Sequence, residues 1–474
     1  MRYKNILLSI SLVLLFEGLS FLLCTPYAVF YHESLKPFLI PAIISLVSGF
    51  SLYSFSGKRF KAIESNKESV TLILISWFIL ILAGALPYLI SKTIPASIDI
   101  LFETISGFTT TGTSILPDIE QLPKSILFWR SLTHWLGGIA TIIMVITIMP
   151  ALKIGGNKLF FPESLSEEKP AHSLVFIVAR VFMVYIVLTV IQALFLYAGG
   201  MSLYTSLCYS FGTVSTGSFS PQNGNMAGYS AYIQYVMLLF MFLSGISYLI
   251  YYLIISGKYK AIRKNDEIRI YVLITFIAAI SFTGILYFDT GKGFGPAFRE
   301  GAFQVVSLVS SSGYSNAEYL SWPDFILPLM YLLIIIGGCV GSASGGIKMS
   351  RFLVLFRNFG LQLKNPTNSE TNISTVKYNG NNIDKETNLS ILTFIFVFGI
   401  VFVFGTLALT FFVPDVKESV FLSISALSNF GYNLSLSGFP NAGKIVLSLL
   451  MLIGRFEIFP VLLLFFPAFY KEVK

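Results

Sequence analysis

The stretch TTTGTS, from Thr109 to Ser114, is a run of hydroxyl side chains around one glycine. It lies between two long apolar segments, Val70–Ile90 and Leu127–Ile148. Three further polar runs, each centred on a glycine, have the same setting: VSTGSF (Val214–Phe219), SSSGYS (Ser310–Ser315) and SNFGYN (Ser428–Asn433). A sequence that builds one kind of polar loop four times in apolar surroundings predicts a fold with four repeated units.

Composition indicates a membrane protein that crosses the bilayer many times. Of the 474 residues, 55% are hydrophobic and only 12% are charged, whereas soluble domains carry about 25% charged residues. The mean hydropathy is +0.76, and apolar segments of about 20 residues, enough to cross a bilayer, recur along the chain. The first of them is too long for a signal peptide and is kept as a helix. We expect ten membrane-spanning helices, near 5–30, 36–56, 69–91, 125–152, 173–198, 230–256, 267–288, 322–347, 389–413 and 443–469.

The distribution of lysine and arginine predicts the orientation. Basic residues gather in the connections after the second, fourth, sixth and eighth expected spans, whereas Gly199–Tyr229 contains neither lysine nor arginine. By the positive-inside rule, the basic connections and both termini are expected on the cytoplasmic side. The net charge of +8 is then explained without nucleic acid as a partner.

Each glycine-centred run follows an apolar segment that is too short to span a bilayer. These segments are SIDILFETISGF, SLYTSLCYSFG, AFREGAFQVVSLV and ESVFLSISALS. The pattern predicts an all-α membrane protein with four helix–re-entrant loop–helix repeats around one pseudo-four-fold pore. The expected units are an N-terminal two-helix hairpin at 1–57 and pore repeats at 69–152, 169–256, 266–357 and 386–474.

The composition of the loops indicates a cation pathway. Non-helical backbone is tolerated at membrane depth only where it is buried in protein or lines a water-filled path. Glycine allows a positive φ, so that successive carbonyl groups can face one axis, and rings of carbonyls replace the hydration shell of a cation. A single loop of this kind is also compatible with an ordinary extracellular turn, but four loops in register favour the pore.

From end to end, the chain resembles the Trk/Ktr/HKT superfamily of potassium translocation subunits. The stretches that carry the resemblance are ETISGFTTTG (Glu103–Gly112), SLTHWLGGI (Ser131–Ile139), GGCVGSASGGIKMSR (Gly337–Arg351), SNFGY (Ser428–Tyr432) and GRFEIF (Gly454–Phe459). The additional N-terminal hairpin is similar to the TrkH branch rather than to KtrB.

The resemblance implies potassium uptake by a homodimer in the bacterial inner membrane, with K⁺ as the transported ion and no organic cofactor. It also implies a separate cytosolic, nucleotide-binding ring of the TrkA or KtrA type. Sodium-preferring relatives carry serine in place of the first filter glycine, and Gly112 is intact here. Carried over residue by residue, the potassium filter would be Thr110, Thr111 and Gly112; Ser215, Thr216 and Gly217; Ser311, Ser312 and Gly313; Asn429, Phe430 and Gly431.

The end of the eighth expected span has two interpretations. Gly337, Gly341 and Gly345 have the spacing of a GxxxG helix-packing interface, but the resemblance implies an unwound gate within the membrane. Unwinding is favoured by the density of glycine, because each glycine costs a helix about 1 kcal/mol. The gate would then comprise Gly337, Gly338, Gly341, Ser342, Ser344, Gly345, Gly346, Lys348 and Arg455.

Arg455 lies near the middle of the apolar segment Val446–Phe466. A charge at that depth costs about 2.5–3.5 kcal/mol on insertion scales, so Arg455 needs a partner or water. Its guanidinium has five N–H donors, and the carbonyls freed by unwinding of the gate could accept them. We expect Arg455 to hold the gate in place.

Other features argue against catalysis. The sequence contains no HExxH, Walker or dinucleotide-binding motif, so we do not expect an enzyme. Cys24, Cys208 and Cys339 are interpreted as core residues, and His134 as a buried histidine rather than a ligand. The polar segment around Asn379-Gly380 is either a small hairpin or a disordered linker.

The alternative function is cation-coupled secondary transport, a K⁺/Na⁺ or K⁺/H⁺ symport that uses the same loops as its binding site. Such transporters also contain broken helices near the bilayer midplane. They typically have two inverted halves and an acidic residue within a span, whereas the four units here share one orientation. In the long apolar segments, the mid-span carboxylates are Glu17 and Glu457.

Overall fold

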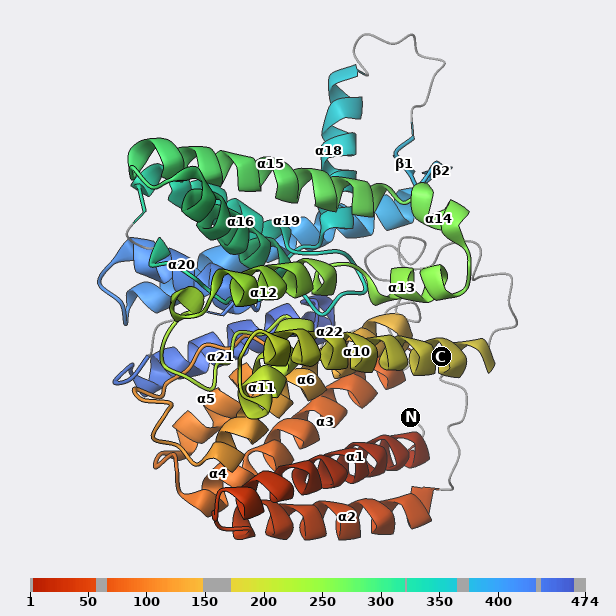
Figure 1. Ribbon diagram of the computed structural model, residues 1–474. Helices are drawn as coiled ribbons and strands as arrows, with labels where there is room; N and C mark the ends of the chain where they lie inside the picture. Colours follow the sequence, from red (N-terminus) through yellow and green to blue (C-terminus); the bar gives the residue numbers. More distant parts are fainter. Residues whose placement is uncertain are drawn as a thin grey trace.

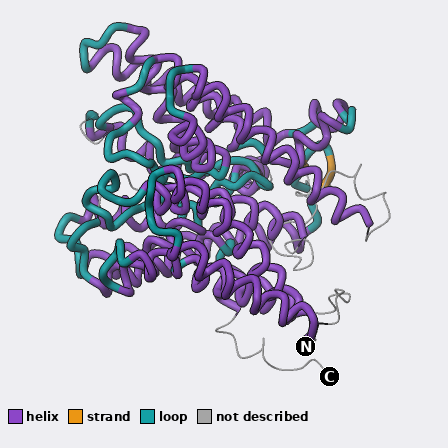
Figure 2. Tube along the Cα trace, turned by 60° about the horizontal axis from the view of Figure 1, so that its bottom comes forward, coloured by secondary structure: helices purple, strands orange, loops and turns teal. Residues whose placement is uncertain are grey.

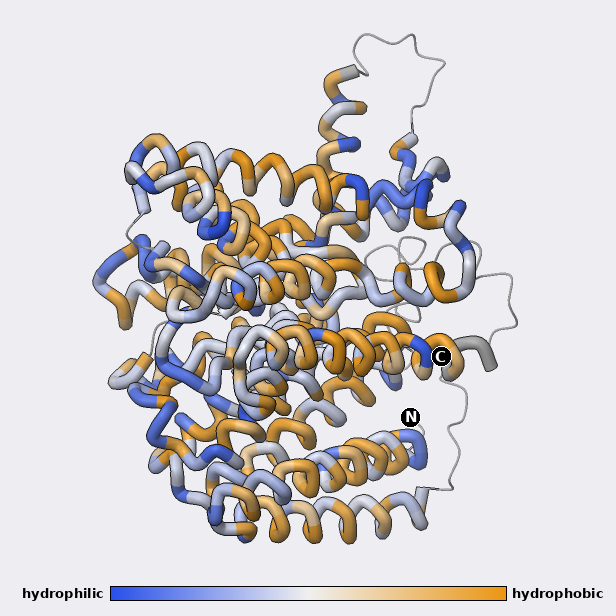
Figure 3. Tube along the Cα trace, in the orientation of Figure 1, coloured by the Kyte–Doolittle hydropathy of each residue, from blue (hydrophilic) through white to orange (hydrophobic). Residues whose placement is uncertain are grey.

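Long helices, lying roughly side by side, dominate the molecule (Figure 1). The computed structural model describes residues 3–56, 66–147, 172–319, 322–364, 375–431 and 436–463. The middle parts of the long helices are apolar, and hydrophilic residues gather at their two ends (Figure 3). Among the described residues, strands occur only in one short hairpin at the edge of the helical body (Figure 2). The predicted all-α class is confirmed.

The first two helices form a hairpin at one edge of the molecule (Figure 1). They are α1 (Tyr3–Phe30) and α2 (Lys36–Ser56). Glycines allow them to approach closely, because a Cβ at Gly18 would lie 2.8 Å from Leu46 Cγ. Exposed apolar side chains along both helices, such as Val47 and Phe50, are typical of a lipid-facing surface.

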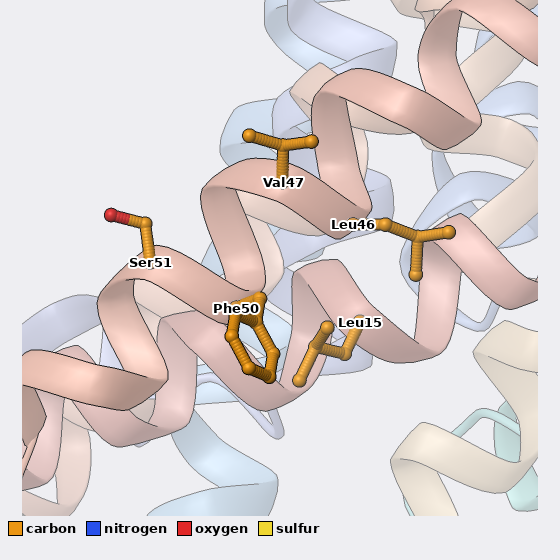
Figure 4. Close-up of a pocket in the computed structure, with 5 residues that line it drawn as sticks. All are labelled: Leu15, Leu46, Val47, Phe50 and Ser51. Carbon is orange, nitrogen blue, oxygen red and sulfur yellow. The ribbon is translucent and has the colours of Figure 1, made fainter.

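A shallow apolar groove runs along this outer hairpin (Figure 4). It is lined by Leu15, Leu46, Val47, Phe50 and Ser51. The groove belongs to the outer face of α1 and α2 and lies away from the four glycine-centred loops. It therefore forms no part of the candidate site.

The remaining helices follow the order long helix, short helix, loop, second helix four times. The first set is α3 (Asn66–Gly84), α4 (Leu86–Ser91), α5 (Ser97–Phe108) and α6 (Lys124–Thr147). The second is α10 (His172–Ala198), α11 (Leu203–Val214), η1 (Met226–Gly228), α12 (Ala231–Ser244) and α13 (Tyr248–Ile255). After α14 (Tyr259–Arg263), the third is α15 (Asp266–Asp289), α16 (Phe294–Ser310), η3 (Asp324–Ile326), α17 (Leu327–Ile336) and α18 (Met349–Lys364). The fourth is α19 (Lys385–Thr410), α20 (Val416–Leu427), α21 (Asn441–Arg455) and α22 (Phe459–Leu463).

Polar side chains mark the starts of several helices. Ser202 accepts a hydrogen bond from the Thr205 N–H at α11, and Asn265 accepts one from the Ile268 N–H at α15. Asp384 and Asp415 cap α19 and α20 in the same way. These caps satisfy N–H groups that have no partner within the helix.

Six of the ten expected spans are long apolar helices: α1, α2, α3 with α4, α10, α15 and α19. The fourth expected span corresponds to α6, which is continuous through its described part. Of the remaining three, 322–347 was expected to unwind at its end, and it does; 230–256 and 443–469 were expected to be continuous, and this expectation was wrong. Span 230–256 bends by 87° between α12 and α13, span 322–347 is an α-helix only in α17, and span 443–469 is interrupted after Arg455.

The three interruptions share a cause. Each begins beside a glycine, at Gly245, Gly337 or Gly454. A Cβ at Gly454 would lie 2.0 Å from the Leu427 carbonyl oxygen at the end of α20. Glycine therefore serves both to end the helix and to let the chain pass the end of a short helix.

The polar segment after α18 contains a small hairpin, the first of the two interpretations that the sequence left open. Strands β1 (Lys377–Tyr378) and β2 (Asn381–Asn382) pair antiparallel, with Tyr378 opposite Asn381. Asn379 and Gly380 both have positive φ, at 51° and 86°, as a tight two-residue turn requires. The hairpin, α14 and the start of α1 lie on the same side of the molecule, at the right of Figure 1.

The three cysteines are buried and unpaired, as the sequence predicted. Tyr432 and the expected basic connection at 148–171 lie outside the described residues.

Candidate functional site

The four glycine-centred loops begin with the same backbone geometry. Each short helix is followed by a residue in the left-handed region: Thr110 (φ 53°), Thr216 (57°), Ser311 (58°) and Asn429 (48°). The next residue donates its N–H to the carbonyl five residues earlier: Thr111 to Ser106 (3.0 Å), Gly217 to Gly212 (2.8 Å), Ser312 to Ser307 (3.0 Å) and Phe430 to Ser425 (3.0 Å). This closure is a standard way to end a helix, and it makes the four loops structurally equivalent.

This equivalence shifts the alignment of the second loop with the other three by one residue. In three loops, a second positive φ falls two residues after the first, at Gly112, Gly313 and Gly431. In the second loop, the corresponding residue is Ser218, because Gly217 is equivalent to Thr111. The expected triplet Ser215, Thr216 and Gly217 therefore starts one residue too early; the equivalent triplet is Thr216, Gly217 and Ser218.

The four loops meet at one point. The Ser218 hydroxyl in the second loop donates to the Thr111 carbonyl in the first, at 3.2 Å. A Cβ at Gly313 in the third loop would lie 2.3 Å from the Phe430 carbonyl oxygen in the fourth. A Cβ at Gly431 would lie 2.1 Å from the Thr111 carbonyl oxygen. The glycines thus allow backbone from different repeats to come into direct contact.

The fourth loop is fixed by its own side chains. Asn429 Nδ2 donates to Thr111 Oγ1 at 3.0 Å and to the Met451 carbonyl at 2.9 Å. The bulky Phe430 is buried, and its ring lies edge-on to that of Phe421, with 6.4 Å between centroids. Phe430 therefore contributes its backbone to the meeting point and its ring to the core.

A buried ion pair supports the first and second loops. Arg130 Nε donates to Glu103 Oε1 at 2.6 Å, and Ser114 Oγ donates to the same carboxylate oxygen at 3.0 Å. Arg130 also donates to the Ser220 carbonyl at 3.0 Å, and its guanidinium lies 3.4 Å from the centroid of the Phe219 ring. One arginine on α6 thus connects α5 with the segments that follow two loops.

His134 forms a second link between these loops. Its Nδ1 lies 2.6 Å from the Gly107 carbonyl oxygen, and its Nε2 accepts the Phe219 N–H at 3.1 Å. The two bonds require the tautomer that carries hydrogen on Nδ1. The imidazole stacks on the Phe219 ring at 4.1 Å between centroids. The expected buried histidine is confirmed, and its contacts are those of a positioning residue.

The segment of the expected gate, 337–348, is not an α-helix. Four of its residues have positive φ: Gly337 (68°), Gly341 (82°), Gly346 (79°) and Lys348 (81°). A GxxxG packing interface requires a continuous helix, so that interpretation is wrong. We call residues 337–348 the intramembrane segment.

The intramembrane segment passes between the broken helices and the fourth loop. The Cys339 N–H donates to the Gly245 carbonyl at 2.9 Å, and Gly341 accepts from the Tyr248 N–H at 3.0 Å. On its other side, a Cβ at Gly345 would lie 1.8 Å from the Ser428 carbonyl oxygen. The segment therefore packs directly against the end of α20, immediately before the fourth loop.

Arg455 holds this segment by its backbone. Its Nη1 donates to the Ala343 carbonyl at 2.7 Å, and its Nη2 donates to the Gly137 carbonyl of α6 at 3.3 Å. The side chain is only 2% exposed. The contact expected between the guanidinium and a freed carbonyl is present.

Other side chains of the expected gate bond within the segment. Ser342 Oγ and Ser344 Oγ are 2.6 Å apart, and Lys348 Nζ donates to the Ser344 carbonyl. The nearby Glu457 pairs with the buried Arg351 rather than with Arg455. Among the described residues, the partners of Arg455 are therefore backbone carbonyls, and no carboxylate pairs with it.

Glu267 also contacts the segment, although it was not expected from the sequence. Its Oε1 accepts from the Val340 N–H at 2.8 Å and from the Ser350 N–H at 3.1 Å. Its neighbour Asp266 accepts from Arg357 at 2.8 Å and from the Asn379 N–H of the hairpin at 2.9 Å. The sequence signal for Glu267 is the acidic pair Asp266 and Glu267, which directly follows the N-capping Asn265 at the start of the apolar helix α15.

The chemistry of the site is that of backbone oxygen. Within the described residues, no group of three or more His, Cys, Asp or Glu side chains could hold a metal ion. At the meeting point, the polar groups are carbonyls, hydroxyls and one amide. Such hard, neutral oxygens suit weakly bound cations that must also leave.

The fold and the site define a multi-pass membrane transport protein in which four re-entrant loops converge between long apolar helices. The chain belongs to the TrkH family of cation transport proteins, whose family model matches residues 38–471.

Relatives and a solved structure agree with this assignment. The chain is 27% identical to the Trk system potassium uptake protein TrkH of Escherichia coli K12, over 97% of this chain and 98% of the relative. It is also 27% identical to TrkH of Vibrio parahaemolyticus, over the full length of both. The crystal structure of the potassium transporter TrkH from Vibrio parahaemolyticus superimposes with a TM-score of 0.90, at 26% identity, and covers 99% of this chain and 100% of that one.

The Glu103–Arg130 pair yields a stability prediction. Arg130→Met removes one partner and leaves the Glu103 carboxylate buried, which typically costs about 3–5 kcal/mol. We expect a marked fall in the thermal unfolding temperature of the purified protein. The matched control is Lys292→Met, because the Lys292–Glu300 pair is partly exposed and contributes only about 0–1 kcal/mol. Equal effects of the two substitutions would contradict the proposed role of the buried pair.

Proposed function

We propose that this protein takes up potassium ions through a single pathway, whose filter is formed by the four loops. The observation that carries the proposal is the meeting of four loops with one backbone geometry. Ions of that size and charge bind rings of carbonyl oxygens. The printed names of the relatives, which are potassium uptake proteins, support the choice of ion. Transport, rather than catalysis, is the activity of this chain.

The proposed filter consists of backbone carbonyls, with the second loop in its corrected position. The triplets are Thr110, Thr111 and Gly112; Thr216, Gly217 and Ser218; Ser311, Ser312 and Gly313; Asn429, Phe430 and Gly431. The short helices α5, α11, α16 and α20 end immediately before these loops. The partial negative charge at a helix C-terminus favours a cation. Isotope flux into liposomes that contain the purified protein tests the proposal, and absence of cation flux would overturn it.

The first functional prediction concerns Gly112. Gly112 has a φ of 82°, and a Cβ there would lie 2.0 Å from Ser218 Oγ. We expect Gly112→Ser to reduce the ratio of potassium to sodium flux by roughly ten-fold, which is about 1.4 kcal/mol. Cells that lack other potassium uptake should then fail to grow at low potassium.

The control for Gly112 is Gly200→Ser. Gly200 also has a positive φ, at 97°, but nothing lies within 4 Å of its Cβ position. Backbone strain without a clash in the filter should leave ion preference unchanged. The amount of inserted protein is measured for both variants. Normal ion preference in well-inserted Gly112→Ser would remove Gly112 from the filter.

The intramembrane segment and Arg455 are proposed to form the gate. The fixed positive charge of Arg455, beneath the filter, repels cations. The hydrogen bond from Arg455 to the Ala343 carbonyl holds the segment in place. Glu267 would anchor the same segment to α15 through two backbone N–H groups. In this arrangement, the closed state depends on hydrogen bonds to backbone, which can be exchanged for water without a change of fold.

The gate proposal predicts a gain of flux. Arg455→Ala, or deletion of Val340–Gly345, should raise potassium flux per inserted molecule in the subunit tested without partners. Arg455→Lys keeps the charge but loses the second hydrogen bond, so its flux should lie between wild type and Arg455→Ala. The exposed Arg263→Ala is a control for loss of one positive charge. Equal or lower flux in both the deletion and Arg455→Ala would exclude a gating role.

Ion-coupled symport is the second candidate, and Glu17 is the observation in its favour. Glu17 on α1 is buried, and among the described residues neither of its carboxylate oxygens has a hydrogen-bond partner. Glu457, by contrast, is occupied by Arg351. Potassium flux that requires a sodium or proton gradient, and loses that requirement in Glu17→Gln, would favour symport. Passive flux down the potassium gradient favours a channel.

The assembly is proposed from the family. A homodimer in the bacterial inner membrane, with both termini in the cytoplasm, would present the β1–β2 hairpin and α14 to a cytosolic, nucleotide-binding ring of the TrkA or KtrA type. Arg357 and Asn379 tie this hairpin to α15. We expect the ring to co-purify with this subunit from its native host in mild detergent. Recovery of the subunit without any such ring would count against this assembly.

A further inference from the structure

Ser218 occupies the position of the missing fourth glycine. Three of the four equivalent positions are glycines with φ of 82°, 72° and 80°, at Gly112, Gly313 and Gly431. The fourth carries a side chain, and its φ is not positive. The four loops are therefore equivalent up to this position and differ there.

The side chain of Ser218 lies among the other three loops. A Cβ at Gly112 would lie 2.0 Å from Ser218 Oγ, and one at Gly431 would lie 2.3 Å from the same atom. A Cβ at Gly313 would lie 2.6 Å from Ser218 Cβ. Ser218 is the nearest neighbour of the Cβ position at Gly112, whereas at Gly313 and Gly431 a backbone carbonyl oxygen lies slightly nearer, at 2.3 and 2.1 Å. The Ser218 side chain therefore lies next to a glycine of each of the other three loops.

The Ser218 hydroxyl also forms a hydrogen bond with one of the carbonyls of the proposed filter. It donates to the Thr111 carbonyl oxygen at 3.2 Å. A hydroxyl has one donor and two acceptor sites. The Ser218 oxygen can therefore coordinate a cation while its O–H keeps this hydrogen bond. In a filter formed by the four loops, this side chain would make the path narrower than four glycines would, and the ion would share the Thr111 carbonyl with a hydrogen bond.

We propose that Ser218 is a specificity-determining residue that lies on the ion path, where its hydroxyl limits the rate of potassium passage and weakens discrimination against sodium. This inference rests on the proposed function, because it requires the four loops to be the filter. Selectivity by cavity size and selectivity by the number of carbonyl dipoles predict the same direction. Removal of the side chain widens the path and frees the Thr111 carbonyl, and both changes favour the larger ion.

The test is a series at position 218, measured as potassium and sodium flux per inserted molecule in liposomes. Ser218→Gly should raise potassium flux by about two- to ten-fold, the equivalent of one hydrogen bond, and should raise the ratio of potassium to sodium flux. Ser218→Thr adds a methyl group and should lower both. The matched control is Ser230→Gly, which makes the same chemical change at the N-cap of α12 and should change neither.

Two outcomes separate this inference from the proposed function. If wild-type protein carries no cation flux, the proposed function fails. If wild type conducts but Ser218→Gly and Ser218→Thr leave both the flux and the ion ratio unchanged, Ser218 is not on the path, and this inference is overturned.

A measurement without flux covers the case in which the glycine variant does not fold. In Ser218→Cys, a small cationic thiol reagent should react at a rate that potassium slows, because ion and reagent compete for the same point. Wild type is the control, since its three cysteines are all buried. If Ser218→Cys reacts with the reagent at the same rate in the presence and absence of potassium, the inference is overturned.

Discussion

The constraint that governs this structure is the need to satisfy polar backbone groups where no water is available. Four loops and one longer segment leave the helical ladder between long apolar helices, and each free N–H or C=O at such depth costs several kcal/mol. The molecule meets this cost with polar side chains from the same repeat and from neighbouring repeats. Ser106 Oγ, for example, donates to the Thr113 carbonyl at 2.6 Å, and Tyr314 donates to the Phe219 carbonyl at 2.9 Å. The same buried serines, threonines and tyrosines would be inexplicable in a simple helical bundle.

Charge within the membrane is handled in two different ways. Arg130 and Arg351 each have a carboxylate partner, so their cost is offset by ion pairing. Arg455 has backbone carbonyl partners instead, and its positive charge therefore remains effective in its surroundings. This difference separates arginines that are paired within the scaffold from the arginine that is proposed to act on a cation.

The sequence predicted the features that depend on local residue type. Gly112, Gly313 and Gly431 were identified because positive φ selects glycine, and the intramembrane segment because so many glycines are incompatible with a helix. The error in the second loop has the same origin, since Gly217 was aligned by its identity although Ser218 holds the equivalent place. The breaks at Gly245 and Gly454 were missed because a lone glycine is tolerated in a helix; contacts with distant short helices make them necessary. The partners of Glu267 and His134 lie far along the chain, and no local pattern identifies those partners.

The closing contacts join residues that are far apart in the chain. Asn429 bonds Thr111 across 318 positions, and Arg455 reaches Gly137 across the same separation. Because a chain is made from its N-terminus and non-local contacts form late, the first loop is synthesised long before its neighbour in the fourth repeat exists. An unfinished chain therefore lacks the contacts that the fourth repeat makes with the first, including those of Asn429 and Arg455. Biosynthesis of this protein must protect three polar loops within the lipid until the last repeat arrives.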